Sequence, residues 1–199
     1  MPRYREIYIK KEAKIIIWKI EETEDELISF LDTTDLSPKF HSYKSLSHRK
    51  QFLATQILLK REEIQNKIIK DVNGKPCLKS GFVSISHDTN YVSLMISNKV
   101  CGIDLQSVSP KVLRIKHKFY DEDDLEQFGE EIDFYTLMWS LKEALYKLFG
   151  VPKLFFKEHL RINYIQDNIA NCSILHPEYV GEYNVYIGKV DNLYLVYTI

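Results

Sequence analysis

The chain has 199 residues, of which 45% are apolar and 13% aromatic, and its 27 Lys and Arg nearly balance its 28 Asp and Glu. This composition excludes a disordered or fibrous protein, and the net charge of −1 argues against a protein that coats DNA. No apolar run approaches the roughly 20 residues needed to span a bilayer, and the charged N-terminus lacks a secretory signal. We therefore expect a soluble, cytoplasmic protein. The three cysteines form no C-x-x-C pair, which predicts small buried hydrophobic residues.

Charge is distributed unevenly along the chain. Residues 21–35 hold seven acids and no base, residues 37–70 hold eight Lys or Arg against two acids, and residues 121–133 hold eight acids and no base. Long charged side chains normally lie in water, so these runs fit solvated helix faces. The second interpretation is a basic surface for an anionic ligand at 37–70.

The first half of the chain alternates between strand and helix patterns. The β-branched run 14–20 predicts a buried strand, and an acidic helix over 21–31 follows it. Apolar residues recur at helical spacing over 46–58, where Ser45 or Ser47 is a candidate N-cap. After a turn at 71–76, three strand-like runs (82–86, 92–96 and 100–105) predict a meander with helices on one face.

The second half predicts helices followed by sheet. We expect short helices over 111–118 and 121–128 and a long helix from about 133 to 149, ended by Gly150. Alternating apolar residues at 160–164, 183–187 and 193–197 then predict strands. The order of elements predicts an α+β protein made of two halves, residues 1–99 and 100–199, each an antiparallel sheet packed with helices.

One stripe of the long predicted helix carries three chemically different side chains. Trp139, Glu143 and Lys147 are spaced i, i+4 and i+8, so an aromatic ring, a carboxylate and an ammonium share a face. The alternative is an ordinary Glu-to-Lys salt bridge beside a core tryptophan, worth a few tenths of a kcal/mol.

One of the predicted strands carries oxygen ligands for a cation at its end. Asp104 and Gln106 are two residues apart and therefore face the same side. Together with Glu143 they would make the hard-cation site that Mg²⁺ prefers, with phosphates and waters completing it. The alternative is a strand-end aspartate that begins a turn. His87, beside Ser86, is a candidate hydrogen-bond donor to a phosphate, or else a structural histidine.

The order of four short motifs is more specific than any one of them. Gly-Lys-Pro at 74–76, Ser-Ile-Ser-His at 84–87, Gly-Ile-Asp at 102–104 and Trp-Ser-Leu-Lys-Glu-Ala-Leu-Tyr-Lys at 139–147 follow one another. In this order the chain resembles the 4′-phosphopantetheinyl transferase superfamily, in its long, surfactin-synthetase-activating type. The resemblance extends from Ser37 to Gly150, and the last 49 residues match only in being strand-rich.

The resemblance implies an activity and a fold. Members of this family transfer the phosphopantetheine arm of coenzyme A to a serine of an apo acyl or peptidyl carrier protein and release adenosine 3′,5′-bisphosphate, with Mg²⁺ as cofactor. Long-type members have two similar α+β halves in one chain, related by a pseudo-twofold, with the active site in the cleft between them. The partners implied are coenzyme A and an apo carrier protein, with no nucleic acid and no membrane. We also expect a monomer.

The resemblance also implies roles for individual residues. Glu143 is the catalytic base and Lys147 neutralises the pyrophosphate. The metal ligands are Asp104, Glu143 and, at the position of a usual glutamate, Gln106. The residues implied in coenzyme A binding are Lys75, Pro76, Ser86 and His87. Basic candidates for its 3′-phosphate and for an acidic carrier protein lie in the 37–70 run: Lys39, His41, Lys44 and Arg49.

Three positions depart from the family pattern. Gln106 replaces a carboxylate, which removes one negative charge and should weaken Mg²⁺ binding. Gln56 stands where relatives often have arginine, and Asp88 stands where a small serine is usual. These departures motivate a rival hypothesis, a degenerate homologue that binds coenzyme A or a carrier protein without turnover. A nucleic-acid-binding module is a third, against which the lack of clustered aromatic residues in the basic helix speaks.

Overall fold

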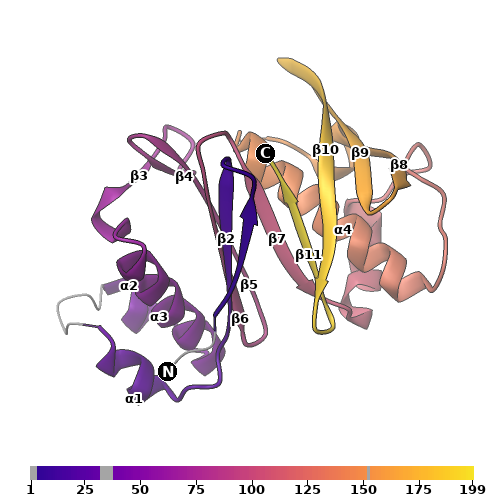
Figure 1. The fold of residues 1–199 in the computed structure, drawn as a ribbon. Helices are drawn as coiled ribbons and strands as arrows, with labels where there is room; N and C mark the ends of the chain where they lie inside the picture. Colours follow the sequence, from indigo (N-terminus) through magenta and orange to yellow (C-terminus); the bar gives the residue numbers. More distant parts are fainter. Residues whose placement is uncertain (1–3, 32–37, 152) are drawn as a thin grey trace.

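The computed structural model describes residues 4–31, 38–151 and 153–199, and within them the strands form two antiparallel sheets (Figure 1). The strands of the first sheet are β1 (Tyr4–Ile9), β2 (Ala13–Lys19), β3 (Ile68–Lys70), β4 (Pro76–Leu78), β5 (Gly81–Asp88) and β6 (Tyr91–Ser97). Their order is β1-β2-β6-β5-β4-β3. The strands of the second sheet are β7 (Gly102–Ser107), β8 (Leu160–Gln166), β9 (Ile169–His176), β10 (Tyr179–Val190) and β11 (Leu193–Thr198). Their order is β7-β11-β10-β9-β8.

The helices lie between these strands in the sequence. The α-helices are α1 (Glu24–Ser29), α2 (Pro38–Ser42), α3 (Leu46–Arg61), α4 (Glu131–Phe149) and α5 (Phe156–His159). In the described ranges there are also three short 3₁₀ helices: η2 (Gln65–Lys67), η3 (Pro110–Arg114) and η4 (Lys116–Lys118). The predicted α+β class is therefore confirmed. In the described part of the chain, no helix has the length and apolar character needed to cross a membrane.

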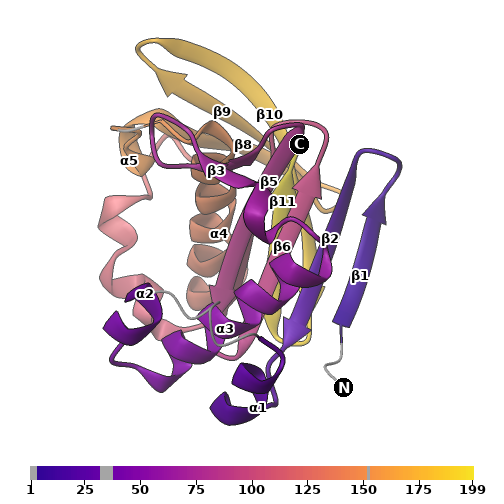
Figure 2. The same cartoon turned by 90° about the vertical axis from the view of Figure 1, so that its left-hand side faces the viewer.

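One face of the first sheet is covered by α1, α2 and α3, as Figures 1 and 2 show. α1 begins at a capping box, in which Thr23 and Glu26 satisfy each other's backbone N–H groups. Leu27 of α1 and Leu53 of α3 are fully buried against Trp18 of β2 in this core. Burial of such apolar area provides most of the free energy that holds helices on a sheet.

The opposite face of the first sheet packs on the second sheet. Ile15 and Ile17 of β2 join Ile103 and Leu105 of β7 in one apolar cluster. A third cluster lies on the far side of the second sheet, where α4 packs on β8 to β11. Because β7 alternates, Gly102, Asp104 and Gln106 face α4 while Ile103 and Leu105 face the first sheet.

The structure corrects several predictions from the sequence. The run 100–105 is not the third strand of a meander, because β7 leaves the first sheet and pairs with β11. The predicted helix over 121–128 is wrong: the segment forms turns, although buried Asp124 anchors it. The 111–118 helix is two 3₁₀ turns. The sequence analysis did not predict β1. It did predict α4 and its end at Gly150, which has a left-handed conformation.

Candidate functional site

Three side chains of β5 form hydrogen bonds to the free edge of β7. The Ile103 N–H donates to Ser84 Oγ at 3.1 Å, and the Leu105 N–H donates to Ser86 Oγ at 3.1 Å. The Ser107 N–H donates to the Asp88 carboxylate. These side chains take the place of backbone carbonyls that an added strand would offer. We call this set of bonds the side-chain ladder; it fixes β5 beside β7.

Asp104 lies at the middle of the ladder, with only 4% of its surface exposed. Its Oδ1 accepts hydrogen bonds from Ser86 Oγ at 2.9 Å and Lys147 Nζ at 2.8 Å. Its Oδ2 accepts one from Ser140 Oγ at 2.8 Å. Lys147 Nζ also donates to Ser86 Oγ at 3.0 Å. A buried carboxylate held by an ammonium and two hydroxyls is electrostatically well compensated.

Glu143 lies on α4 one turn before Lys147 and is half-buried. It does not form the Glu-to-Lys salt bridge considered as an alternative, because the Lys147 ammonium pairs with Asp104 instead. Within the described ranges, no hydrogen bond reaches the Glu143 carboxylate. Burial raises the pKa of Glu143 to about 7; the Asp104 charge adds to the increase and the Lys147 charge opposes it. A carboxyl group with this pKa can accept and release a proton near neutral pH.

Trp139 occupies the start of the same stripe and belongs partly to the core. Its ring stacks on Phe156 with centroids 5.2 Å apart and meets Phe119 edge-on at 5.3 Å. Its other side lines a cavity of about 180 Å³ together with Asp88 and Gln106. The structure thus confirms the helix that carries Trp139, Glu143 and Lys147 at intervals of four residues, and it shows that the Trp139 ring packs on the core.

The Gly-Lys-Pro turn lies against the end of α4. Lys75 Nζ donates to the carbonyl oxygen of Leu148 at 2.5 Å, and a Cβ on Gly150 would lie 2.4 Å from Lys75 Cδ. Burial lowers the pKa of the Lys75 ammonium. A lysine at the C-terminal end of a helix is favourable because unpaired carbonyls concentrate negative potential there. The glycine that ends α4 thus also makes room for the lysine.

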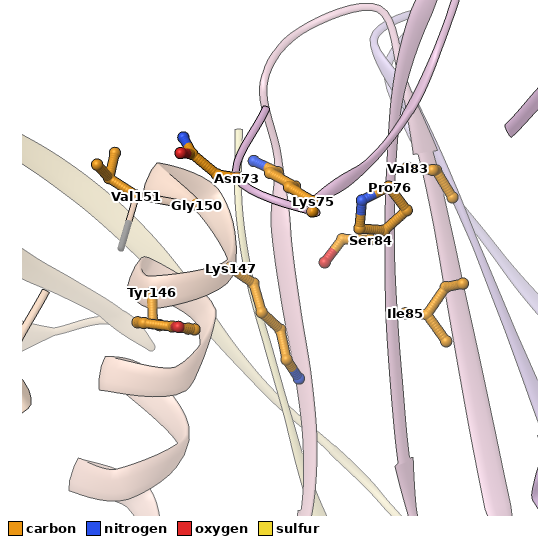
Figure 3. Close-up of a pocket in the computed structure, with 11 residues that line it drawn as sticks. Asn73, Lys75, Pro76, Val83, Ser84, Ile85, Tyr146, Lys147, Gly150 and Val151 are labelled. Carbon is orange, nitrogen blue, oxygen red and sulfur yellow. The ribbon is translucent and has the colours of Figure 1, made fainter. Parts of the chain in front are cut away.

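A cavity of about 340 Å³ opens between this turn, β5 and α4. Lys75, Pro76 and Ser84 line it on one side, and Tyr146 and Lys147 line it on the other (Figure 3). Figure 3 shows Lys147 extending from α4 toward the strands, with Lys75 near the last turn of the helix. Two ammonium groups on one small cavity suit a ligand with several negative charges.

Gly102 explains why the Gly-Ile-Asp motif begins with glycine. A Cβ at this position would lie 2.0 Å from the carbonyl oxygen of Ala144 and 2.7 Å from the Leu148 nitrogen. Only a residue without a side chain lets β7 run this close to α4. The glycine thereby brings Asp104, two residues later, within reach of Ser140 and Lys147 of that helix.

Gln106 is directed toward Asp88. Its Nε2 donates to Asp88 Oδ2 at 3.5 Å, the oxygen that also accepts the Ser107 N–H. The same face of β7 holds Asp104, as predicted. Asp88, one of the three departures from the family pattern, is therefore the charged member of the side-chain ladder.

His87 lies on the opposite face of β5 from Ser86, as consecutive strand residues do. Its side chain is exposed, yet the surrounding protein, with the nearby Lys147 and His48 charges, lowers its pKa. Ser86 already uses its hydroxyl donor on Asp104 and accepts from Lys147 and the Leu105 N–H. A ligand that binds Ser86 must therefore replace one of these partners.

Of the basic candidates from the 37–70 run, His41, Lys44 and Arg49 do not join this cluster. Arg49 of α3 pairs with Glu24 of α1, with Nε 2.9 Å from Oε2. His41 contacts the Phe40 ring, and Lys44 lies on the surface. Lys39 belongs to α2, but its side chain is outside the described part of the structure.

The sequence analysis assigned no role to two further residues of the 139–147 motif, Ser140 at the site and Lys142 in the core. Ser140 holds Asp104, and its position three residues before Glu143 and seven before Lys147 places it on their helix face. Lys142 is completely buried, and its ammonium contacts Asp124 at 2.7 Å and the Phe119 carbonyl at 2.5 Å. It anchors the acidic segment to α4. The helical spacing within the 139–147 motif was the signal for Ser140, whereas nothing local marked Lys142 as buried.

The carboxylates fit a divalent cation only in part. The described residues contain no group of three or more His, Cys, Asp or Glu side chains arranged to hold a metal ion. Mg²⁺ in phosphate-binding sites, however, usually takes one or two carboxylates, with waters and substrate phosphates as the other ligands. Asp104 and Glu143 are the two carboxylates that would fill this role. Asp104 Oδ1 already accepts hydrogen bonds from Ser86 and Lys147 and Oδ2 accepts one from Ser140, so a cation would compete with the Lys147 ammonium. Gln106 has only its carbonyl oxygen to contribute.

Comparisons with known proteins agree with the motifs. No family model matches the chain. A 4′-phosphopantetheinyl transferase, psf-1 of Bacillus pumilus, is 33% identical over 86 residues, which cover 39% of this chain and 37% of the relative. The 4′-phosphopantetheinyl transferase Sfp of Bacillus subtilis (strain 168) is 28% identical over 85 residues, which cover 39% of this chain and 38% of the relative.

These matches confirm the resemblance to the 4′-phosphopantetheinyl transferase superfamily. Within it, the similarity is to the surfactin-synthetase-activating type, as the motif order predicted. The matched part of the chain spans less than two fifths of the length of these curated relatives.

Proposed function

We propose that the chain is an enzyme that transfers the 4′-phosphopantetheine arm of coenzyme A to a serine of an apo acyl or peptidyl carrier protein. The observation that carries this proposal is the juxtaposition of Glu143, which has a pKa near 7, with the Asp104–Lys147 pair beside the cavity that Lys75 also lines. That arrangement supplies a base, a cation for the pyrophosphate and a positively charged cavity for coenzyme A. Both curated relatives are named for this transfer.

The proposal assigns the two sheets to two similar halves. Residues 1–99 would carry the coenzyme A segments and residues 100–199 the metal aspartate and the catalytic helix. The two halves would be related by a pseudo-twofold, with the active site in a cleft between them. Supporting this, the first sheet ends at Ser97 and the second begins at Gly102. Because one chain holds both halves, we expect a monomer.

The proposed reaction needs a base and charge neutralisation. Glu143 takes the proton of the carrier serine, directly or through a water, and the serine Oγ attacks the phosphorus that bears the pantetheine. The bond from this phosphorus to the bridging oxygen breaks, and that oxygen leaves with adenosine 3′,5′-bisphosphate. Lys147 stabilises the negative charge that shifts toward the leaving group.

A divalent cation, proposed to be Mg²⁺, would be held by Asp104 and Glu143, with Gln106 as a third, neutral candidate. When bound, such an ion screens the pyrophosphate charge and orients its oxygens. Ser140 and Ser86 hold the Asp104 carboxylate in place for this role.

Coenzyme A is proposed to occupy the cavity at the end of α4. The Lys75 ammonium has three N–H donors, and its bond to Leu148 uses one of them. Pro76, Ser86 and His87 complete the proposed set. Lys39 and Arg49 remain proposed contacts of the 3′-phosphate or of an acidic carrier; Arg49 would have to exchange Glu24 for such a partner.

A specific observation favours the non-catalytic alternative. Asp104 already has three hydrogen-bond partners, so the chain could bind coenzyme A without turnover. Incubation with coenzyme A, Mg²⁺ and several apo carrier proteins, followed by mass spectrometry of each carrier, separates the two. Addition of the arm is the expected result. Retained coenzyme A binding without addition to any carrier would support the alternative.

A further inference from the structure

The Asp88 carboxylate is fixed through both of its oxygens. Oδ1 accepts the Thr89 hydroxyl at 3.1 Å, and Oδ2 accepts the Ser107 N–H and, at 3.5 Å, Gln106 Nε2. The neighbouring members of the side-chain ladder, Ser84 and Ser86, bond the same edge of β7 with hydroxyls. Asp88 is thus the only charged member of the ladder.

A carboxylate selects one end of an amide. Ionised Asp88 has acceptors only, so it binds the NH₂ end of Gln106 and excludes the carbonyl end. The Gln106 carbonyl oxygen is left on the other side of the amide, and within the described residues nothing donates a hydrogen bond to it. This oxygen belongs to the face of β7 that also presents Asp104, two residues earlier.

We propose, building on the function proposed above, that Asp88 is a positioning residue. By holding the Gln106 nitrogen, it presents the Gln106 carbonyl oxygen as a neutral oxygen ligand for the divalent cation beside Asp104. Asp88 and Gln106, two of the departures from the family pattern, then act together, because their side chains are hydrogen-bonded to each other. An amide carbonyl is an acceptable ligand for a hard cation, and a fixed one loses less entropy on binding.

The effect of Asp88 on position must be separated from the effect of its charge. Asp88→Ala and Asp88→Asn both remove the negative charge, and therefore lose the same long-range attraction for a cation. Only Asn keeps an oxygen that accepts from Ser107 and Gln106. The difference between these two variants reports the positioning effect alone.

Mn²⁺ is a suitable probe, because its binding to the full-length chain can be titrated by electron paramagnetic resonance without any transfer reaction. We expect Asp88→Ala to bind Mn²⁺ at least about threefold more weakly than Asp88→Asn. In a Gln106→Ala background the two substitutions should have equal affinity. Ser97→Ala, which removes hydrogen bonds to Glu12 and Lys99 without touching β7 or Gln106, should leave Mn²⁺ affinity unchanged.

A second readout needs no metal. In the wild-type chain and Asp88→Asn, the Gln106 side-chain amide resonances should show a hydrogen-bonded proton, and in Asp88→Ala they should move to the values of a free amide. Equal Mn²⁺ affinities of the two Asp88 variants, or absence of Mn²⁺ binding by the wild-type chain, would overturn the positioning role. Failure of the wild-type chain to modify any carrier would instead contradict the proposed transferase activity.

Discussion

The Lys75 ammonium lies 2.5 Å from the carbonyl oxygen of Leu148, a residue 73 positions later in the chain. This bond joins a turn of the first sheet to the last turn of α4, and it closes one end of the cavity proposed for coenzyme A. Lys75 therefore has two separable tasks, capping a helix and presenting positive charge to a ligand.

Replacing Lys75 by Met should affect substrate binding more than the chemical step. We expect KM for coenzyme A to rise about tenfold with a smaller change in kcat, because a charged hydrogen bond to phosphate contributes about 1.5 kcal/mol. The lost bond to Leu148 should lower the free energy of unfolding by about 1 kcal/mol. Lys79→Met changes an exposed lysine in the next turn, between β4 and β5; it is the matched control and should behave like the wild type.

Glu143→Gln should reduce transfer by a factor of about 100 or more, since the base is lost. The control Glu131→Gln, at the exposed start of the same helix, should retain activity. Steady-state transfer to an apo carrier measures both. Activity of Glu143→Gln close to that of the wild type would remove Glu143 from the mechanism.

The raised pKa of Glu143 also predicts that the stability of the chain depends on pH. Its folded pKa of about 7 lies above its ordinary value, so its protonated form is favoured by folding, and the stability it contributes is lost as the pH rises through 7. In metal-free buffer, Glu143→Gln and the wild type should have the same free energy of unfolding near pH 4. At pH 8 the variant should be more stable by about 2 kcal/mol. Denaturant unfolding at the two pH values provides the measurement. A difference that did not grow between them would contradict the raised pKa.

Gly102→Ala should destabilise the chain strongly. The added methyl group would lie 2.0 Å from the Ala144 carbonyl oxygen, so β7 and α4 must separate. We expect a loss of about 3 kcal/mol, as for overpacking against backbone. Gly188→Ala is the control, because its nearest neighbour would be Leu195 O at 3.6 Å and the change should be small. Thermal unfolding of both variants tests this comparison.

The buried Lys142–Asp124 pair predicts non-additive effects. Lys142→Met leaves the Asp124 charge without its partner and should lower the free energy of unfolding by about 3–5 kcal/mol. Asp124→Asn in the same chain should restore part of this loss, since Asn still accepts the Ile162 N–H that Asp124 accepts at 3.0 Å. A double variant as unstable as the sum of the single ones would show that the two groups do not interact.

Helical periodicity and stop signals predicted α4 well because they are local. The amphipathic run and Gly150, with its left-handed φ of 66°, contain most of the information that defines this helix. The segment 121–128 shows the limit of that approach. Its turns are fixed by the buried contact between Asp124 and Lys142, which lies eighteen residues away and is not visible in local spacing.

In the functional site, too, local patterns were predictable and contacts between distant segments were not. The face shared by Glu143 and Lys147 was predictable from spacing along one helix, and so was the shared face of Asp104 and Gln106 on one strand. The pairing of Lys147 with Asp104 was not, because it depends on how closely β7 approaches α4. The role of Asp88 depends likewise on the side-chain ladder.

The side-chain ladder has a consequence for any attempt to divide the chain between β6 and β7. A fragment that starts at β7 would expose unpaired N–H groups along one sheet edge, together with apolar residues such as Ile103 that the first sheet normally covers. Such an edge recruits further copies of itself. We therefore expect the separated fragments to aggregate when produced alone and to reassemble when they are produced together, so that both sheets unfold in one cooperative transition.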